Sequence, residues 1–116
     1  MELKDQVASL ELSKRLKELG VNQQSLFYWH EEYGDYRIYR FGMIAENLND
    51  LDKDDISAFT VAELGNLLPQ TIGMDRWTGG WSMRTLDSKR CNYTDGETEA
   101  EARAKMLIYL LENKLI

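Results

Sequence analysis

The fold is decided by one stretch of sequence, TEAEARAKMLIYLLENKLI at residues 98–116. Its apolar residues recur at helical spacing, and Glu99 and Glu101 each precede a basic residue by four positions, a pattern that stabilises helices. Thr98 followed by Glu101 also matches a capping box, in which the hydroxyl and the carboxylate accept hydrogen bonds from backbone N–H groups of the first turn. We therefore expect a helix that begins after Thr98 and supplies much of the core.

This expected closing helix has two apolar flanks. The first must face the core and consists of Ala100, Ala104, Leu107, Ile108, Leu111 and Leu115. The second consists of Ala102, Met106, Tyr109 and Leu110. A neighbouring helix or sheet edge would cover the second flank in an ordinary domain, whereas methionine and tyrosine are also favoured at the centres of protein interfaces. The second flank is thus the candidate interface, with a second core face as the alternative.

Two further helices are expected upstream. Residues 6–19 carry leucines at helical spacing, and Gly20 follows where a left-handed residue commonly ends a helix. Thr60 and Glu63 form another capping-box pattern, and Pro69 marks the end of the helix that they begin. The sequence therefore predicts three helices.

Two β-hairpins are expected between these helices, because aromatic and β-branched residues gather on both sides of two glycine-containing turns. The predicted strand pairs are residues 26–33 with 36–41 around Gly34-Asp35, and residues 71–78 with 81–86 around Gly79-Gly80. The polar segments 42–56 and 87–97 predict connecting loops.

We expect a single α+β domain over residues 1–116, with the order helix–hairpin–helix–hairpin–helix. The two hairpins would form one four-stranded antiparallel sheet packed with three helices. Both faces of the first hairpin carry bulky side chains, so helices on both sheet faces, as in an α/β/α sandwich, are favoured over helices on one face.

The overall charge excludes some functions. Lys and Arg number 14 against 20 Asp and Glu, a formal net charge of −6 that argues against direct binding to DNA or RNA.

The single cysteine, Cys91, excludes an intrachain disulfide, and no Cys/His cluster exists to hold zinc. The sequence lacks a membrane-length apolar run and a signal-peptide pattern, so we expect a cytoplasmic protein.

An acidic loop and a lone histidine are the nearest approaches to a metal or catalytic site. Asp50, Asp52, Asp54 and Asp55 invite a calcium hypothesis, but Asp55 stands where an EF-hand needs glycine and Val61 where it needs glutamate. A solvated loop without metal is expected. His30, the only histidine, lies in a predicted strand without a partner at a recognisable spacing, so a structural role is favoured over general-base catalysis.

Two further groups of residues are weaker candidates for a site. Cys91 follows Lys89 and Arg90, which could lower the pKa of its thiol, but no nucleophile signature surrounds it. A basic aromatic face for single-stranded nucleic acid would require convergence of Arg37, Arg40, Arg76 and Arg84 with Trp29, Trp77 and Trp81. Trp81 and Arg84 point to opposite faces of their predicted strand, which favours the alternative of an aromatic core with the arginines outside. No phosphate loop or hydrolase motif is present, so no catalytic residue and no cofactor are expected.

Four segments resemble small uncharacterised proteins encoded by phages and prophages: residues 9–20, 26–30, 56–69 and 98–116. The helix–hairpin–helix–hairpin–helix order is also similar to phage α/β/α sandwich domains. The closing segment is the most specific part of this resemblance. The resemblance implies a phage context in a bacterial host, and it implies no reaction, catalytic residue or cofactor.

Three functions follow as hypotheses. The first is a non-enzymatic phage or prophage accessory protein, monomeric or homodimeric, that binds an unknown protein partner and neither nucleic acid nor membrane. The second is an acidic inhibitor or nucleic-acid mimic acting on a host protein, which a dense acidic patch would favour over dispersed charges. The third is a small enzyme of unrecognised type, which would require a concave pocket with two convergent polar groups.

Overall fold

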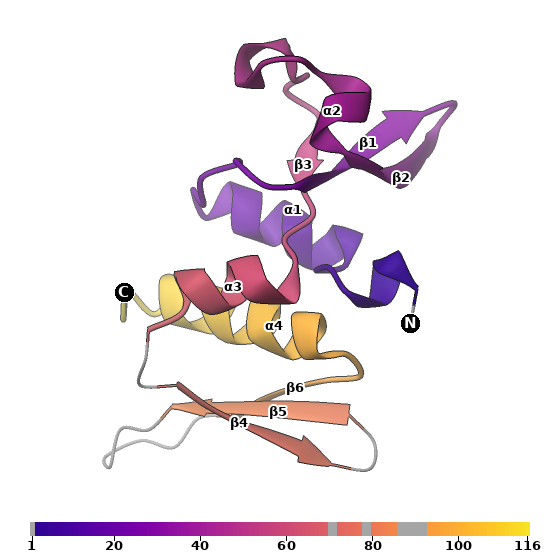
Figure 1. Ribbon diagram of the computed structural model, residues 1–116. Helices are drawn as coiled ribbons and strands as arrows, with labels where there is room; N and C mark the ends of the chain where they lie inside the picture. Colours follow the sequence, from indigo (N-terminus) through magenta and orange to yellow (C-terminus); the bar gives the residue numbers. More distant parts are fainter. Residues whose placement is uncertain (1, 70–71, 78–79, 86–92) are drawn as a thin grey trace.

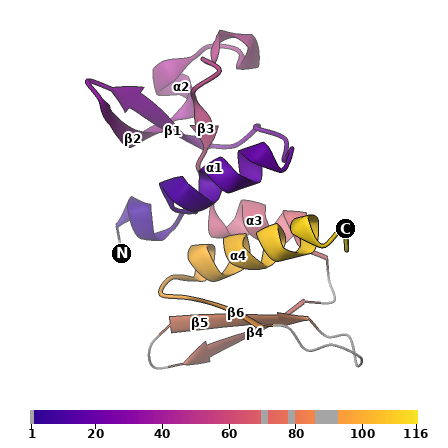
Figure 2. The ribbon, with the colours of Figure 1, turned by 180° about the vertical axis from the view of Figure 1, so that it is seen from behind.

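The computed structural model describes residues 2–69, 72–77, 80–85 and 93–116, and it is an α+β structure in three layers. A layer of helices lies between two small antiparallel sheets (Figures 1 and 2). The main helices are α1 (Leu10–Glu18), α3 (Val61–Leu67) and α4 (Glu99–Glu112). The predicted α/β/α order is therefore wrong, because the helices form the middle layer.

The first sheet has the order β2-β1-β3, with β1 at Phe27–Glu32, β2 at Asp35–Arg40 and β3 at Ile56–Ser57. All pairs are antiparallel, and Trp29 pairs with Ile38 on one side and Ile56 on the other. Between β2 and β3 the chain forms the short helix α2 (Phe41–Ile44) and the 3-10 helix η2 (Leu48–Asp50), where an acidic loop was expected.

The second sheet has the order β4-β5-β6, with β4 at Ile72–Trp77, β5 at Gly80–Thr85 and β6 at Tyr93–Gly96. The two predicted hairpins are thus present but belong to different sheets, so the expected four-stranded sheet is wrong. Each hairpin completes its sheet with a short strand, β3 or β6, from a segment predicted as a loop.

Local signals set the helix ends. The helix α1 begins later than predicted, because the hydroxyl of Ser9 caps the N–H of Leu12 and the chain before it forms the 3-10 helix η1 (Leu3–Asp5) and a bridge from Val7 to Thr60. The Thr60–Glu63 capping box is confirmed in both directions.

The start of α4 departs from its predicted capping box in one bond. The Thr98 hydroxyl accepts from the N–H of Glu101, as predicted, but the Glu101 carboxylate accepts from the N–H of Glu97 instead of Thr98. The predicted ion pair between Glu99 and Arg103 is present at 2.8 Å.

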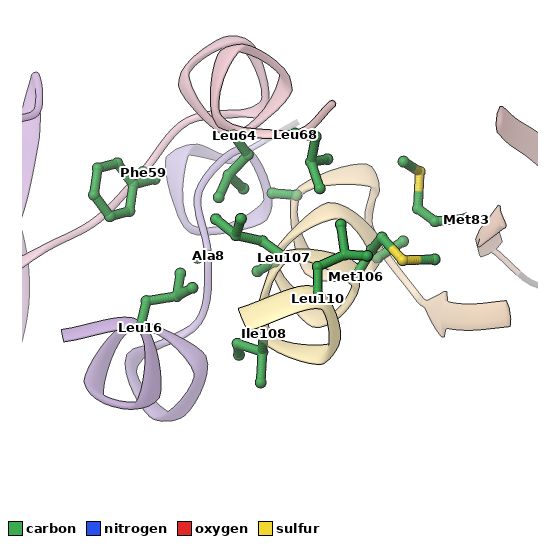
Figure 3. Packing of buried hydrophobic residues seen from close by; sticks show 13 residues of the cluster. Ala8, Leu16, Phe59, Leu64, Leu68, Met83, Met106, Leu107, Ile108 and Leu110 are labelled. Carbon is green, nitrogen blue, oxygen red and sulfur yellow. The ribbon is translucent and has the colours of Figure 1, made fainter. Parts of the chain in front are cut away.

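The core is centred on α4, which is apolar on two sides because it lies between α1 and α3 on one side and the second sheet on the other (Figures 1 and 3). The first flank of α4 meets Leu16 and Leu64, and the second lies towards Met83 of β5. The buried part of the first flank ends before Leu115, which was expected to face the core but is exposed because the helix stops at Glu112.

This packing buries most of the candidate interface on α4 inside the protein. Ala102 and Met106 have no exposed surface, and Leu110 is 4% exposed. These three residues form part of the protein's own core, as the alternative of a second core face required. Tyr109 is half-buried and packs against the core cluster.

Candidate functional site

The first sheet and its connections carry most of the net charge of the protein. Residues 27–57 form one end of the molecule (Figure 1), and we call them the acidic lobe. They contain eight acidic residues against three basic ones, which accounts for −5 of the net charge of −6. The acidic members are Glu31, Glu32, Asp35, Glu46, Asp50, Asp52, Asp54 and Asp55. The charge is therefore concentrated at one end instead of being dispersed over all faces.

A pocket of about 260 Å³ opens in the acidic lobe, between the end of the β1–β2 hairpin and the turn that precedes β3. Polar and acidic residues dominate its lining, which consists of His30, Glu31, Tyr33, Gly34, Asp52, Asp54 and Asp55. Its lining residues come from two segments that are separated by about twenty positions in the sequence.

His30 and Asp55 form a close pair in this pocket. His30 Nδ1 lies 2.6 Å from Asp55 Oδ1, and the Asp55 side chain is only 5% exposed. The sequence had suggested no partner for His30, because the two residues are 25 positions apart and meet only when β3 pairs with β1. Two convergent polar groups therefore share a concave pocket, which is the feature that the small-enzyme hypothesis requires.

The turn that carries Asp52 and Asp55 is held by its own backbone and by α1. The N–H of Asp52 donates to Asp55 Oδ2 at 2.9 Å, and the N–H of Asp55 donates to the carbonyl oxygen of Asp52 at 3.0 Å. Lys17 of α1 donates to the carbonyl oxygens of Lys53 and Asp55. These bonds fix the backbone of the acidic turn against the helical layer.

The negative field of the acidic lobe acts on two tyrosines of β2. Desolvation and the charges of Glu31, Asp54 and Asp55 raise the pKa of Tyr36 above 10.0. The hydrogen bond that the Tyr39 hydroxyl donates to Glu32 raises the pKa of Tyr39, with desolvation adding to it. The Tyr39 ring also meets His30 edge-on, with ring centres 5.7 Å apart. His30, which lines the pocket, is therefore connected through Tyr39 to Glu32 on the neighbouring part of the sheet.

Tyr33 stands at the tip of the hairpin and is 97% exposed. The two-residue turn is Tyr33-Gly34, one position earlier than predicted, and both residues have positive φ, 53° and 83°. Asn-Gly or Gly-Gly is the favoured sequence for such a turn, because a side chain with a Cβ is strained in the left-handed region. A bulky aromatic residue is thus presented to solvent at a conformationally unfavourable position, beside the acidic pocket.

The other predicted candidates do not assemble into sites. Asp50 binds the N–H of Asn47 at the start of η2 and does not line the pocket. Trp29 and Trp81 belong to different sheets on opposite sides of the helices, so they do not share one aromatic face, in keeping with the preference against a nucleic-acid face. Cys91 lies outside the described residues, as do the side chains of Arg76 and Trp77.

Comparisons of the chain with family models, curated proteins and solved structures found no match. Function must therefore be argued from the site itself. In the described part of the chain, no helix combines the length and the apolar character needed to cross a bilayer.

Proposed function

We propose that this protein is a non-enzymatic protein–protein interaction module, and that its acidic lobe binds a basic surface of a partner protein. The observation that carries this proposal is the concentration of −5 of the net charge in residues 27–57, at one end of the molecule. Concentrated charge raises the rate of encounter with an oppositely charged protein and orients the approach.

Tyr33 would anchor this contact. An exposed tyrosine offers a large rigid contact area, and its ring attracts Arg and Lys side chains by cation–π interaction. The carboxylates of Glu31, Asp52 and Asp54 line the neighbouring pocket and would pair with the same basic side chains. The strain of a left-handed tyrosine has no packing benefit inside this chain, because the side chain is almost wholly exposed.

The proposed setting is the cytoplasm of a bacterium that carries a phage or prophage, where the protein would act as an accessory protein, monomeric or homodimeric. The resemblance of residues 98–116 to phage-encoded proteins supports this setting. A dense acidic lobe also favours one version of the function, in which the partner is a nucleic-acid-binding protein and the acidic lobe occupies its basic site.

Matched charge variants test the proposal. Glu31→Gln/Asp35→Asn/Asp54→Asn neutralises three exposed acids in the acidic lobe, and Glu11→Gln/Asp95→Asn/Glu97→Gln neutralises three exposed acids elsewhere. Tagged versions of both, and of the unmodified protein, are used to purify partners from a lysate of the bacterium that carries the gene. We expect a partner that the unmodified protein and the second variant retain and the first variant loses.

Tyr33→Asn gives an independent measure, because asparagine suits the turn and removes the ring. It should fold at least as stably as the unmodified protein and bind the partner at least tenfold more weakly, the loss typical of an interface anchor. Equal retention by the two charge variants would contradict the assignment to the acidic lobe. Failure to retain any protein above background would contradict the interaction module itself.

A further inference from the structure

We propose that His30, Asp52 and Asp55 form a binding site for one divalent transition-metal ion of the zinc class. Each residue offers one ligand atom, and these atoms all lie within 4.8 Å of one another. Ligand atoms around a tetrahedral ion with bonds of about 2.1 Å stand about 3.4 Å apart. Side-chain rotations alone would therefore bring the three atoms to bonding distance. This site does not rest on the protein partner proposed above, but it shares Asp52 with the proposed contact surface.

The types of ligand select the class of metal. Calcium and magnesium prefer shells made of oxygen atoms alone, and the EF-hand pattern is absent from this loop. An imidazole nitrogen with two carboxylates suits zinc, cobalt, nickel or manganese. Three protein ligands also leave a coordination position for water, as in open zinc sites. His30 is therefore the residue that distinguishes this cluster from an ordinary acidic loop.

The charge around the cluster favours a cation. Asp52 and Asp55 contribute two carboxylates, and Glu31 and Asp54 line the same pocket. Among the described residues, no lysine or arginine forms an ion pair with any of these four, and His30 is the one side chain hydrogen-bonded to the Asp55 carboxylate. A divalent ion would neutralise carboxylates that have no lysine or arginine partner among the described residues.

The backbone already holds the ligands in position. His30 is fixed on β1 by pairing with Arg37, and the reciprocal bonds between Asp52 and Asp55 fix the turn. Lys17 binds the carbonyl oxygens of that turn and not its carboxylates. Metal binding would thus require no rearrangement of strands, only replacement of the contact between His30 and Asp55 by bonds to a shared ion.

The binding experiment uses zinc chloride and the full chain in a Cys91→Ser background, because a cysteine thiolate would itself bind zinc. Calorimetry gives the stoichiometry and affinity, and NMR follows the imidazole signals, which belong to His30 alone because the chain has one histidine. We expect one zinc ion per chain, with a shift of the His30 ring signals that saturates at the same ratio. Magnesium chloride should leave these signals unchanged.

Two exposed aspartates of the same turn provide the matched pair. Asp52→Asn and Asp54→Asn remove the same charge, but only Asp52 is a proposed ligand. Asp52→Asn should weaken zinc binding roughly tenfold or more, and Asp54→Asn by about twofold at most, as expected for a removed ligand and a nearby charge. Both substitutions replace exposed side chains and should not disturb folding, and the NMR spectrum of each variant checks that it is folded.

Several results would overturn the site. Equal weakening by the two variants would mean that zinc is attracted only by general negative charge. One-to-one binding without a shift of the His30 signals would place the ion elsewhere. Absence of binding would leave His30 and Asp55 as a structural hydrogen-bonded pair.

Discussion

The indole Nε1 of Trp29 donates a hydrogen bond to the carbonyl oxygen of Ala8 at 3.1 Å, and this bond ties the first sheet to the segment that precedes α1. The hydroxyl of Ser13 donates to the same oxygen at 3.2 Å. Two donors from different elements therefore satisfy one buried carbonyl.

This shared acceptor predicts non-additive stability effects. Ser13→Ala leaves the carbonyl bonded to Trp29 and should lower the free energy of unfolding by about 1 kcal/mol. Trp29→Phe leaves the carbonyl bonded to Ser13 but also removes ring contacts, so it should lower the free energy of unfolding by more than Ser13→Ala does. The double variant leaves the carbonyl unsatisfied and should lose about 1 kcal/mol or more beyond the sum of the two. Chemical denaturation of the unmodified protein, the two single variants and the double variant measures these free energies. Losses that add strictly in the double variant would contradict the shared acceptor.

Gly96 should not tolerate a side chain. A Cβ atom at Gly96 would lie 2.5 Å from the backbone nitrogen of Ala102, at the close contact between β6 and α4. Because backbone cannot yield as a flexible side chain does, Gly96→Ala should lower the free energy of unfolding by about 1–3 kcal/mol. Gly42→Ala is the control, since a Cβ there meets nothing within 4 Å, and it should cause no loss. Similar denaturation midpoints for the two variants would refute this account.

Thr98 should contribute to stability through its hydroxyl. Its side chain accepts the N–H of Glu101 at 3.1 Å and caps α4, the helix at the centre of the core. Thr98→Ala should cost about 1 kcal/mol, whereas Thr98→Ser keeps the hydroxyl and should retain most of the stability. Thermal unfolding of both variants distinguishes capping from loss of the methyl group, because loss of the methyl group would make serine as harmful as alanine.

Tyr39 should make stability fall at alkaline pH. Its pKa in the folded protein is raised above 10.0, first by the hydrogen bond to Glu32. The folded state therefore holds this proton more tightly than the unfolded state. The resulting stabilisation is fully present below about pH 10 and is lost as the pH rises through the folded pKa.

Glu32→Gln should lower the pKa of Tyr39, because it removes both the anionic acceptor and its charge. NMR titration of the tyrosine ring signals, assigned with Tyr39→Phe, gives the midpoint directly. An unchanged midpoint in Glu32→Gln would show that the hydrogen bond does not control this group.

The features predicted well from sequence depend on residues that are close together in the chain. The Thr60–Glu63 capping box, the Glu99–Arg103 pair and the left-handed Gly20 all follow from spacings of a few residues. The short strands β3 and β6 escaped prediction, because two or four residues are too few to show a two-residue alternation. Each forms only by pairing with a hairpin that the sequence marks much more clearly.

The division into two sheets and the pairing of His30 with Asp55 could not be predicted for a related reason. Hairpin signals specify the partner within a hairpin but not which hairpins join, and here the helices separate them. His30 and Asp55 come from β1 and the turn before β3, so their contact depends on the strand that sequence reasoning missed. The second flank of α4 was ambiguous because a core face and an interface have the same composition.

The position of the helices between the two sheets has a spectroscopic consequence. Trp29 belongs to the first sheet, whereas Trp77 and Trp81 belong to the second, so the intrinsic fluorophores are divided between the outer layers. A variant that keeps only Trp29 would report on the acidic lobe, and one that keeps only Trp81 would report on the opposite layer. Coincident fluorescence transitions would show that the helical layer joins both ends into one cooperative unit, and separate transitions would show that each end melts on its own.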